Sequence, residues 1–349
     1  MAKIMMKGNE AIGEAAIMAG CTHYFGYPIT PQNELTAYMS KMLPKRGGVF
    51  LQSESEIAAI NMVYGAGAAG ARVMTSSSGP GISLKSEGIS YIACSEIPAV
   101  IVNIQRGGPG LGTIQPSQAD YLQATKGGGH GDYHLIVLAP ASVQELVDLT
   151  QKAFDLADKY RNPVMILGDG LLGQMMEPVE IKEVKIGDYD KSWALTGAKG
   201  RAPHRITSFD IDPYKLEEVV LKLKEKYEKI KQNEIMYEEI QADDAEILIV
   251  AFGSMGRISK TVVRELRDEG INAGLLRPIT VWPFPEKRLY TLASRIKKIF
   301  VTEMNAGQML EDVERVVKGN AAIHFYGRPG GVVPTPQELK EEIKRLLGR

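Results

Sequence analysis

Cysteine is scarce in this sequence of 349 residues: Cys21 and Cys94 are the only two. Two thiols exclude a framework of several disulfides and a four-cysteine iron–sulfur cluster held by this chain alone. Histidine gives no strong metal signal, because the one close pair, His130 and His134, lies in a glycine-rich stretch with no glutamate beside His130. Any redox centre that works with this chain must therefore belong to a partner.

Long apolar runs and an excess of one charge are also missing. No stretch approaches the roughly 20 apolar residues of a membrane-spanning helix, and the N-terminus lacks the apolar segment and cleavage site of a signal peptide. The 41 Lys and Arg residues nearly balance the 42 Asp and Glu residues, which argues against nucleic acid or an anionic membrane surface as a partner. We therefore expect a cytoplasmic protein that binds neither.

Helix and strand patterns alternate along the chain, which predicts an α/β fold with parallel sheets. The length is enough for two ordinary domains, and 44% apolar with 24% charged residues is a globular composition. We predict a doubly wound parallel-sheet domain at residues 1–200 and a smaller α/β domain at residues 245–349. Between them, residues 201–244 form a linker with a charged amphipathic helix at about 212–239, after a polar domain crossing at 177–205.

The stretch 47–81 places polar side chains at two strand ends. The predicted order is strand (Val49–Gln52), helix (about Glu54–Ala69), strand (Arg72–Thr75) and loop. Two carboxylates, Glu54 and Glu56, begin the helix, and the loop contains Ser76, Ser77, Ser78 and Gly79. Ligands of open α/β sheets bind at the carboxyl ends of the strands. We therefore expect a polar organic ligand between an acidic strand end and one rich in hydroxyl groups.

Two glycine patterns resemble cofactor motifs but lack the required context. Residues 65–70 match GxGxxG, yet they end a predicted helix and precede a strand, which excludes the dinucleotide fingerprint. Residues 168–170 read Gly-Asp-Gly, as in the motif that binds Mg²⁺ and thiamine diphosphate, but no asparagine occurs from 171 to 232. We expect a structural turn at 168–170 and no metal site in this chain.

Three further segments are candidates for function. The turn Tyr27-Pro28-Ile29-Thr30-Pro31 is either a rigid connection between strand and helix or the carrier of a functional threonine. Arg106 follows a continuous apolar strand at 98–104, where it can bind a carboxylate or form an ordinary salt bridge. The loop 107–132 is long enough to be either functional or disordered.

Taken together, these motifs resemble the α subunit of 2-oxoacid:ferredoxin oxidoreductases, most closely the 3-methyl-2-oxobutanoate (2-ketoisovalerate) type. The resemblance covers nearly the whole chain, from Lys7 to about Leu339. It rests on YPITP at 27–31, QxExEIAA at 52–59, SSSGPG at 76–81, QRGGP at 105–109, GGHGD at 128–132 and the stretch 277–285. The chain departs from the commoner YPITPSS by having Gln32-Asn33 after the motif, which we expect to tune substrate or subunit contacts.

The resemblance implies a pyrimidine-type thiamine-diphosphate-binding domain and a smaller, transketolase-C-terminal-like α/β domain. It implies an enzyme subunit in the CoA-dependent oxidative decarboxylation of a branched-chain 2-oxoacid. Thiamine diphosphate would be shared with a β subunit that carries the diphosphate and Mg²⁺ site, and coenzyme A would be a co-substrate. A γ subunit and a ferredoxin-like δ subunit would complete the complex, with [4Fe-4S] clusters on partner subunits and ferredoxin as the acceptor.

The resemblance also assigns the site residues. Glu56 is the catalytic carboxyl group that binds N1′ of the cofactor's aminopyrimidine, a role that suits a buried acid with a raised pKa. Glu56 is preferred over Glu54 because Gly65 follows it by nine residues, as in thiamine enzymes generally. Thr30 and Arg106 are the catalytic residues expected to bind the substrate, and His130 is a weaker candidate. The cofactor-binding residues are Glu56, Tyr27, Pro28, Ile29, Ser77, Ser78 and Gly79.

Two alternatives stay open at this point: a non-oxidative thiamine-dependent lyase or decarboxylase, and a non-catalytic assembly subunit. The role of the second domain is also open. We expect it to support the first domain and to dock subunits, with Trp282 and Phe284 as apolar anchors. The competing interpretation places both rings in the core of this chain.

Overall fold

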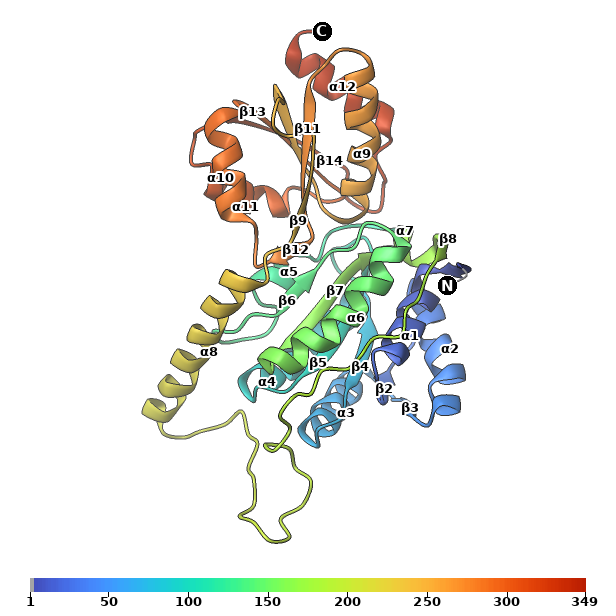
Figure 1. Ribbon diagram of the computed structural model, residues 1–349, viewed down its shortest axis with the longest axis vertical. Helices are drawn as coiled ribbons and strands as arrows, with labels where there is room; N and C mark the ends of the chain where they lie inside the picture. Colours follow the sequence, from blue (N-terminus) through green and yellow to red (C-terminus); the bar gives the residue numbers. More distant parts are fainter. Residues whose placement is uncertain (1–2) are drawn as a thin grey trace.

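The computed structural model describes residues 3–349 and contains two α/β bodies that lie one above the other in Figure 1. A seven-stranded sheet organises the larger body, and a five-stranded sheet organises the smaller one. Strands β1 (Ile4–Lys7) and β8 (Met176–Val179) pair as a separate antiparallel ribbon. In the part of the chain that the structure describes, no helix is long and apolar enough to cross a membrane.

The seven-stranded sheet has the order β12-β6-β7-β5-β4-β2-β3, and every neighbouring pair is parallel except β12 with β6. Helices α1 and α6 pack together on one face, and α3 and α4 pack together on the other. The predicted doubly wound arrangement is therefore confirmed. The bounds are β2 (His23–Gly26), β3 (Val49–Gln52), β4 (Val73–Ser77), β5 (Ala99–Gln105), β6 (Ile136–Leu138), β7 (Pro163–Asp169), α1 (Gly8–Met18), α2 (Asn33–Met42), α3 (Glu56–Ala68), α4 (Pro80–Cys94), α5 (Tyr121–Lys126), α6 (Val143–Tyr160) and α7 (Gly170–Gln174), with a 3-10 turn at Pro44–Arg46.

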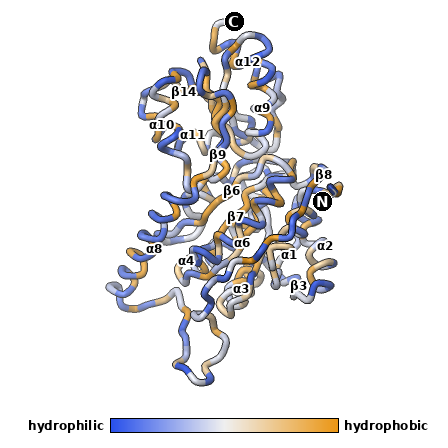
Figure 2. Tube along the Cα trace, in the orientation of Figure 1, coloured by the Kyte–Doolittle hydropathy of each residue, from blue (hydrophilic) through white to orange (hydrophobic). Residues whose placement is uncertain are grey.

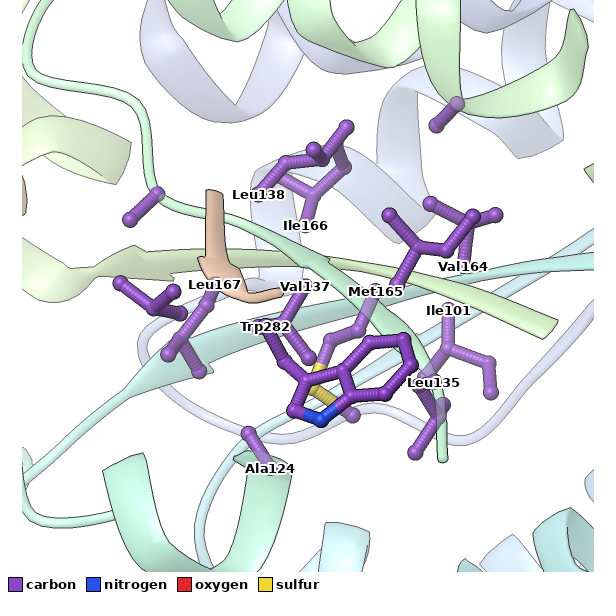
Figure 3. Packing of buried hydrophobic residues seen from close by; sticks show 14 of the residues in the cluster. Ile101, Ala124, Leu135, Val137, Leu138, Val164, Met165, Ile166, Leu167 and Trp282 are labelled. Atoms are coloured by element: carbon purple, nitrogen blue, oxygen red, sulfur yellow. The ribbon is translucent and has the colours of Figure 1, made fainter. Parts of the chain in front are cut away.

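The centre of this sheet is apolar because β5 and β7 are buried along their whole length. Figure 3 shows Ile101 of β5 close to Val164 of β7, with Met165, Ile166 and Leu167 following along the same strand. Strands covered by helices on both faces read as continuous apolar runs, which is why the sequence predicts them well. Polar side chains gather instead toward their carboxyl ends, where the apolar runs stop.

The five-stranded sheet has the order β14-β13-β10-β11-β9, with β9 antiparallel at one edge. Helices α9 and α12 pack together, as do α10 and α11. The bounds are β9 (Tyr237–Ile240), β10 (Ile247–Val250), β11 (Ala273–Pro278), β12 (Thr280–Trp282), β13 (Lys298–Glu303), β14 (Ala322–Gly327), α8 (Pro213–Asn233), α9 (Gly253–Asp268), α10 (Glu286–Arg295), α11 (Gln308–Val317) and α12 (Pro336–Leu347).

Two short strands, β9 and β12, connect the two bodies. The charged helix α8, on which Figure 2 shows many hydrophilic residues, ends at Asn233 rather than near residue 239, and β9 then joins the smaller sheet. Strand β12 follows β11 of the smaller sheet in the sequence but pairs with β6 of the larger sheet. The buried guanidinium of Arg277 adds an ionic connection, because it binds Glu145 of α6 and Glu238 of β9.

Trp282 and Phe284 are part of the core of this chain, with 7% and 6% of their surface exposed. The Trp282 ring stacks on His134 at 4.4 Å and meets Tyr227 edge-on at 5.7 Å. Figure 3 shows it among Ala124, Leu135 and Met165. The expectation that these rings anchor a partner subunit is therefore wrong. They pack in the core of this chain, where Trp282 holds β12 against the larger body.

Several predicted loops differ from the structure. Residues 107–132 contain the short helix α5. The stretch 180–212 has no helix or strand and returns along the larger body (Figure 1), where Leu195 N donates to Ala68 O at 2.9 Å, instead of crossing between the bodies. The turn at 168–170 is confirmed: Asp169 ends β7 and caps α7 by accepting from Leu171 N and Leu172 N.

Candidate active site

The two carboxylates that follow β3 have different environments. Ser55 caps α3, because its Oγ accepts from Ala58 N at 3.2 Å, and Glu56 is therefore the first residue of the helix. Glu54 precedes the cap and is exposed, whereas Glu56 is only 6% exposed. The tertiary structure thus separates the pair and directs only Glu56 into the interior.

The hydroxyl-rich end of β4 lies beside this carboxyl group. Ser76 and Ser77 are the last residues of the strand rather than loop residues, and Ser76, Ser77 and Ser78 are all fully buried. In the first turn of α4, a Cβ atom on Gly81 would lie 2.1 Å from Ser77 Oγ and 2.7 Å from Glu56 Oε1. The expected meeting of an acidic and a hydroxyl-rich strand end is therefore present, and it requires glycine at position 81.

Two of these serines have no hydrogen-bond partner. The Oγ atoms of Ser77 and Ser78 are buried without a partner in the described chain. Buried polar atoms are normally paired, and an exception needs an explanation such as a ligand or an ordered water. The Glu56 carboxyl and these hydroxyls therefore gather unused polar groups at the ends of β3 and β4, packed closely against Gly81 of α4.

Ser76 points to a different partner. Its Oγ donates to Gln32 Oε1 at 2.5 Å, and Gln32 also accepts from Thr36 Oγ1 at 3.2 Å. Tyr24 OH lies 2.5 Å from Ser76 Oγ, which closes a buried network. Gln32 is fully buried, so it does not contact a substrate or subunit directly; Asn33 is exposed and donates to Thr30 Oγ1 at 3.2 Å, and its expected role stays a prediction. Gln32 supports the carboxyl ends of β2 and β4 from inside.

The turn at 27–31 is held beside these strand ends by Arg106. Tyr27 and Pro28 are exposed, and Ile29 and Thr30 are half-buried. The Arg106 side chain, 7% exposed at the end of β5, donates from Nη1 to Thr30 O and from Nη2 to Leu111 O, each at 2.9 Å. Within residues 3–349 it forms no ion pair with a carboxylate, so the ordinary salt bridge is not what holds it. Three of its five N–H groups, including the buried Nε, stay available.

A cavity of about 550 Å³ opens next to Arg106, between the two bodies. Burial raises the pKa of Asp120 at its wall, although a hydrogen bond from Asn103 and the charge of Arg106 oppose that effect. The cavity is lined mostly by small residues: Gly79, Pro80, Ser83, Gly107, Gly108, Pro109, Gly110, Ser117, Ala119, Asn305, Ala306, Gln308, Pro329 and Gly330. His130 is exposed and does not line this cavity.

One buried charge in this region has no counterpart in the sequence predictions. Lys85 of α4 is fully buried, and its Nζ donates to Thr75 Oγ1 at 2.6 Å. Burial lowers the pKa of Lys85 to about 7, although the charge of Glu56 opposes the shift. The available signal was a lysine one helical turn after Gly81, on the helix face that covers the sheet.

The next question is whether the described residues also bring metal-binding side chains together. Among residues 3–349, no group of three or more His, Cys, Asp and Glu side chains is arranged to hold a metal ion. A diphosphate bound through Mg²⁺ would thus need ligands other than such a group of this chain.

Comparison with known proteins agrees with the division of the chain into two bodies. Residues 14–241 match the family model of the thiamine-diphosphate-binding part of pyruvate flavodoxin/ferredoxin oxidoreductase, and residues 245–339 match that of core domain II of pyruvate:ferredoxin oxidoreductase. The chain is 51% identical to the ketoisovalerate oxidoreductase subunit VorB of Methanothermobacter thermautotrophicus, over 100% of this chain and 99% of that one. It is 38% identical to the 2-oxoglutarate synthase subunit KorA of the same organism, over 98% of each chain.

A solved structure confirms the fold. The 2-oxoglutarate:ferredoxin oxidoreductase from Magnetococcus marinus, solved with 2-oxoglutarate, coenzyme A and succinyl-CoA bound, superposes with a TM-score of 0.88 at 29% identity. The match covers 99% of this chain, and this chain spans 65% of that one. The protein is therefore a member of the 2-oxoacid:ferredoxin oxidoreductase family, an α-type subunit of the ketoisovalerate oxidoreductase kind.

Proposed function

We propose that this chain is the subunit that binds the aminopyrimidine of thiamine diphosphate in a complex that oxidatively decarboxylates 3-methyl-2-oxobutanoate with coenzyme A. The observation that carries the proposal is the meeting of the buried Glu56 carboxyl with the unpartnered Ser77 hydroxyl beside Gly81. The substrate rests on the higher identity to ketoisovalerate oxidoreductase subunits than to 2-oxoglutarate synthase subunits.

In this proposal Glu56 is the carboxyl group that shares a proton with N1′ of the aminopyrimidine. Ser77 and Ser78 supply the hydroxyl groups for its polar edge, and Gly79 with Tyr27, Pro28 and Ile29 forms the surrounding wall. When bound, thiamine diphosphate supplies the electron sink that decarboxylation of a 2-oxoacid requires. The chain's own contribution is to orient that group and to control one proton at Glu56.

Arg106 and Thr30 are proposed to position the substrate. The free N–H groups of Arg106 can donate to a carboxylate, and charge-assisted bonds of this type are roughly twice as strong as neutral ones. Because Arg106 already holds Thr30 O, a carboxylate bound to its guanidinium would also lie close to the Thr30 backbone. The adjoining cavity is lined by glycine, alanine and proline together with the polar residues Ser83, Ser117, Asn305 and Gln308, which offer room for an aliphatic chain and hydrogen-bonding groups for a co-substrate.

The remaining parts of the reaction are proposed to come from partners. A β subunit would bind the diphosphate and Mg²⁺, and a γ subunit with a ferredoxin-like δ subunit would complete the complex. The [4Fe-4S] clusters of the partner subunits would carry the electrons to ferredoxin. The two cysteines of this chain, one buried and one half-buried, stand apart from the site: Cys21 precedes β2 and Cys94 ends α4.

The test is an assay of the assembled complex. We expect ferredoxin reduction that requires both 3-methyl-2-oxobutanoate and coenzyme A, with 2-oxoglutarate a poorer substrate. Release of a free aldehyde without an electron acceptor would instead identify a non-oxidative lyase. Full activity of a complex that carries Glu56→Gln would contradict a catalytic role for this chain.

A further inference from the structure

The cavity beside Arg106 has one acidic side chain in its wall, Asp120, to which the proposed function gives no task. Among the described residues that line this cavity of about 550 Å³, Arg106 and Asp120 are the only ionisable ones. The smaller body contributes only neutral side chains to the wall. Asp120 is half-buried there, so the single carboxyl group of an otherwise uncharged cavity wall needs an explanation beside that of Arg106.

Asp120 is held in place by the end of β5. Its Oδ2 accepts from Asn103 Nδ2 at 2.9 Å, and its backbone N donates to Gln105 Oε1 at 3.1 Å. Asn103 is fully buried and Gln105 is 1% exposed, so both anchors belong to the centre of the larger sheet. The carboxyl group therefore has a defined position at the cavity wall, as a group that acts on a bound molecule requires.

Arg106 and Asp120 share the cavity without pairing with each other. In the described chain, the Arg106 guanidinium donates to Thr30 O and Leu111 O, each at 2.9 Å, and the Asp120 carboxyl accepts from the neutral amide of Asn103. Neither charge is consumed by the other. Arg106 keeps N–H groups for a carboxylate, and Asp120 keeps a carboxyl group that can take up a proton.

The proposed reaction needs a proton acceptor in this cavity because its co-substrate is a thiol. The thiolate is the nucleophile, and a free thiol with a pKa of about 8.5 is mostly protonated at neutral pH. A general base works best when its pKa lies near the operating pH. Burial raises the pKa of Asp120 toward that range, against the Asn103 hydrogen bond, the charge of Arg106 and a hydrogen bond from the Gly79 backbone. Arg106 is the one other charged group on the described wall.

We propose that Asp120 is the catalytic base for the thiol of coenzyme A, whose S–H group it deprotonates in the cavity beside Arg106. The S–H bond breaks, the proton passes to a carboxylate oxygen of Asp120, and the electron pair stays on sulfur, which forms the S–C bond of the thioester. The electrons of the oxidation pass to ferredoxin, and the proton leaves Asp120 for the solvent. The inference rests on the proposed function, since it assigns a residue to the thiol step of that reaction.

The experiment is the pH profile of kcat/KM for coenzyme A, measured on the assembled complex with saturating 3-methyl-2-oxobutanoate. In the wild type, kcat/KM should be level around neutral pH and fall toward acid pH as Asp120 becomes protonated. Asp120→Asn preserves the shape and removes the base, so kcat/KM at neutral pH should fall by about 100-fold. In this variant kcat/KM should rise about tenfold per pH unit toward the thiol pKa, because the thiol then ionises in solution.

A loss in Asp120→Asn that is equal at every pH would make Asp120 structural and overturn the inference. If Asp120→Asn does not assemble, Asp120→Ala takes its place, and added acetate should restore part of its activity. Asp132→Asn is the matched control, because Asp132 is exposed and does not line the cavity. It should reproduce the wild-type profile.

Single-turnover release of carbon dioxide in the absence of coenzyme A separates the inference from the proposed function. This release involves no thiol, so Asp120→Asn should slow it far less than it slows the turnover that depends on coenzyme A. Equal losses in the two measurements would overturn the role of Asp120 as a base. If Glu56→Gln releases carbon dioxide at the wild-type rate, the proposed function fails whatever the profile of Asp120→Asn.

Discussion

Glu56 of the larger body and Glu303 of the smaller one are the same residue type in similar places with opposite environments. Both are buried where a parallel strand meets a helix. The Glu303 carboxylate accepts hydrogen bonds from Met309 N at 2.8 Å, Leu310 N at 3.0 Å and Asn305 Nδ2 at 2.8 Å. In residues 3–349 the Glu56 carboxylate accepts none. The Glu303 carboxylate is used within the fold, whereas the Glu56 carboxylate has no hydrogen-bond partner in the described residues.

The difference separates a carboxyl group that is used within the fold from one that has no partner there. Glu303 satisfies the orphan N–H groups at the start of α11, the usual use of a carboxylate there. Ser55 already performs that task for α3, so the Glu56 carboxyl is left for another partner. Leaving a buried carboxyl group without a hydrogen-bond partner is expensive.

The largest effect should come from Glu56→Gln. It keeps the shape of the side chain but removes an exchangeable proton, so turnover of the complex should fall by about 10²- to 10⁴-fold. Unfolding of the chain by urea should change little. Glu54→Gln is the matched control, because Glu54 is exposed two residues away. Equal losses of turnover in the two variants would contradict the different roles predicted for Glu56 and Glu54.

The next effect concerns stability at alkaline pH. Burial lowers the pKa of Lys85 to about 7 from its ordinary value of 10.5. Between these values the unfolded chain binds more protons, so the Lys85 contribution to the free energy of unfolding rises with pH from about 7 to 10.5. The rise should be on the order of 3 to 5 kcal/mol. Urea denaturation across this range should show it in the wild type and not in Lys85→Met; parallel curves would contradict the buried charge.

A smaller effect is expected from Glu303→Gln. Burial raises the pKa of Glu303 to about 7 from 4.5, so the folded chain binds the extra proton between these values and the Glu303 contribution to stability falls as pH rises. Replacing the acceptor should cost about 1 to 3 kcal/mol near pH 5, and the loss should shrink toward pH 7. Thermal or urea unfolding at both pH values measures it. A loss that grew with pH would show that Glu303 is held as a carboxylate.

The smallest effect on stability should come from Ser77→Ala. The hydroxyl has no partner in the described chain, so its removal should leave the free energy of unfolding unchanged or raise it by up to about 1 kcal/mol. Affinity of the complex for thiamine diphosphate should nevertheless fall by about tenfold, the equivalent of one lost hydrogen bond. Isothermal titration calorimetry on the complex measures the affinity. A stability loss without an affinity loss would make Ser77 structural, like Glu303.

Much of the fold and part of the site could be predicted from the sequence. The strands β3, β5 and β7 and the helices α1, α3, α4 and α6 follow from apolar periodicity, which acts over a few residues. The resemblance to thiamine enzymes, through the spacing to Gly65, preferred Glu56 over Glu54, and the structure buries the preferred one. The roles of Thr30, Arg106, Ser77 and Ser78 stay predictions, although the structure places them around the same strand ends.

What only the tertiary structure decided depends on residues far apart in the sequence. No local pattern shows that β12 leaves its own body to pair with β6, or that Gln32 points inward to Ser76 instead of toward a substrate. In the sequence, Lys85 resembles an exposed lysine. Its burial follows only from the packing of α4 against β4. The physical reason is that helix and strand preferences are short-range properties of the chain. Whether a polar atom is buried, and whether it has a partner there, is settled by long-range packing.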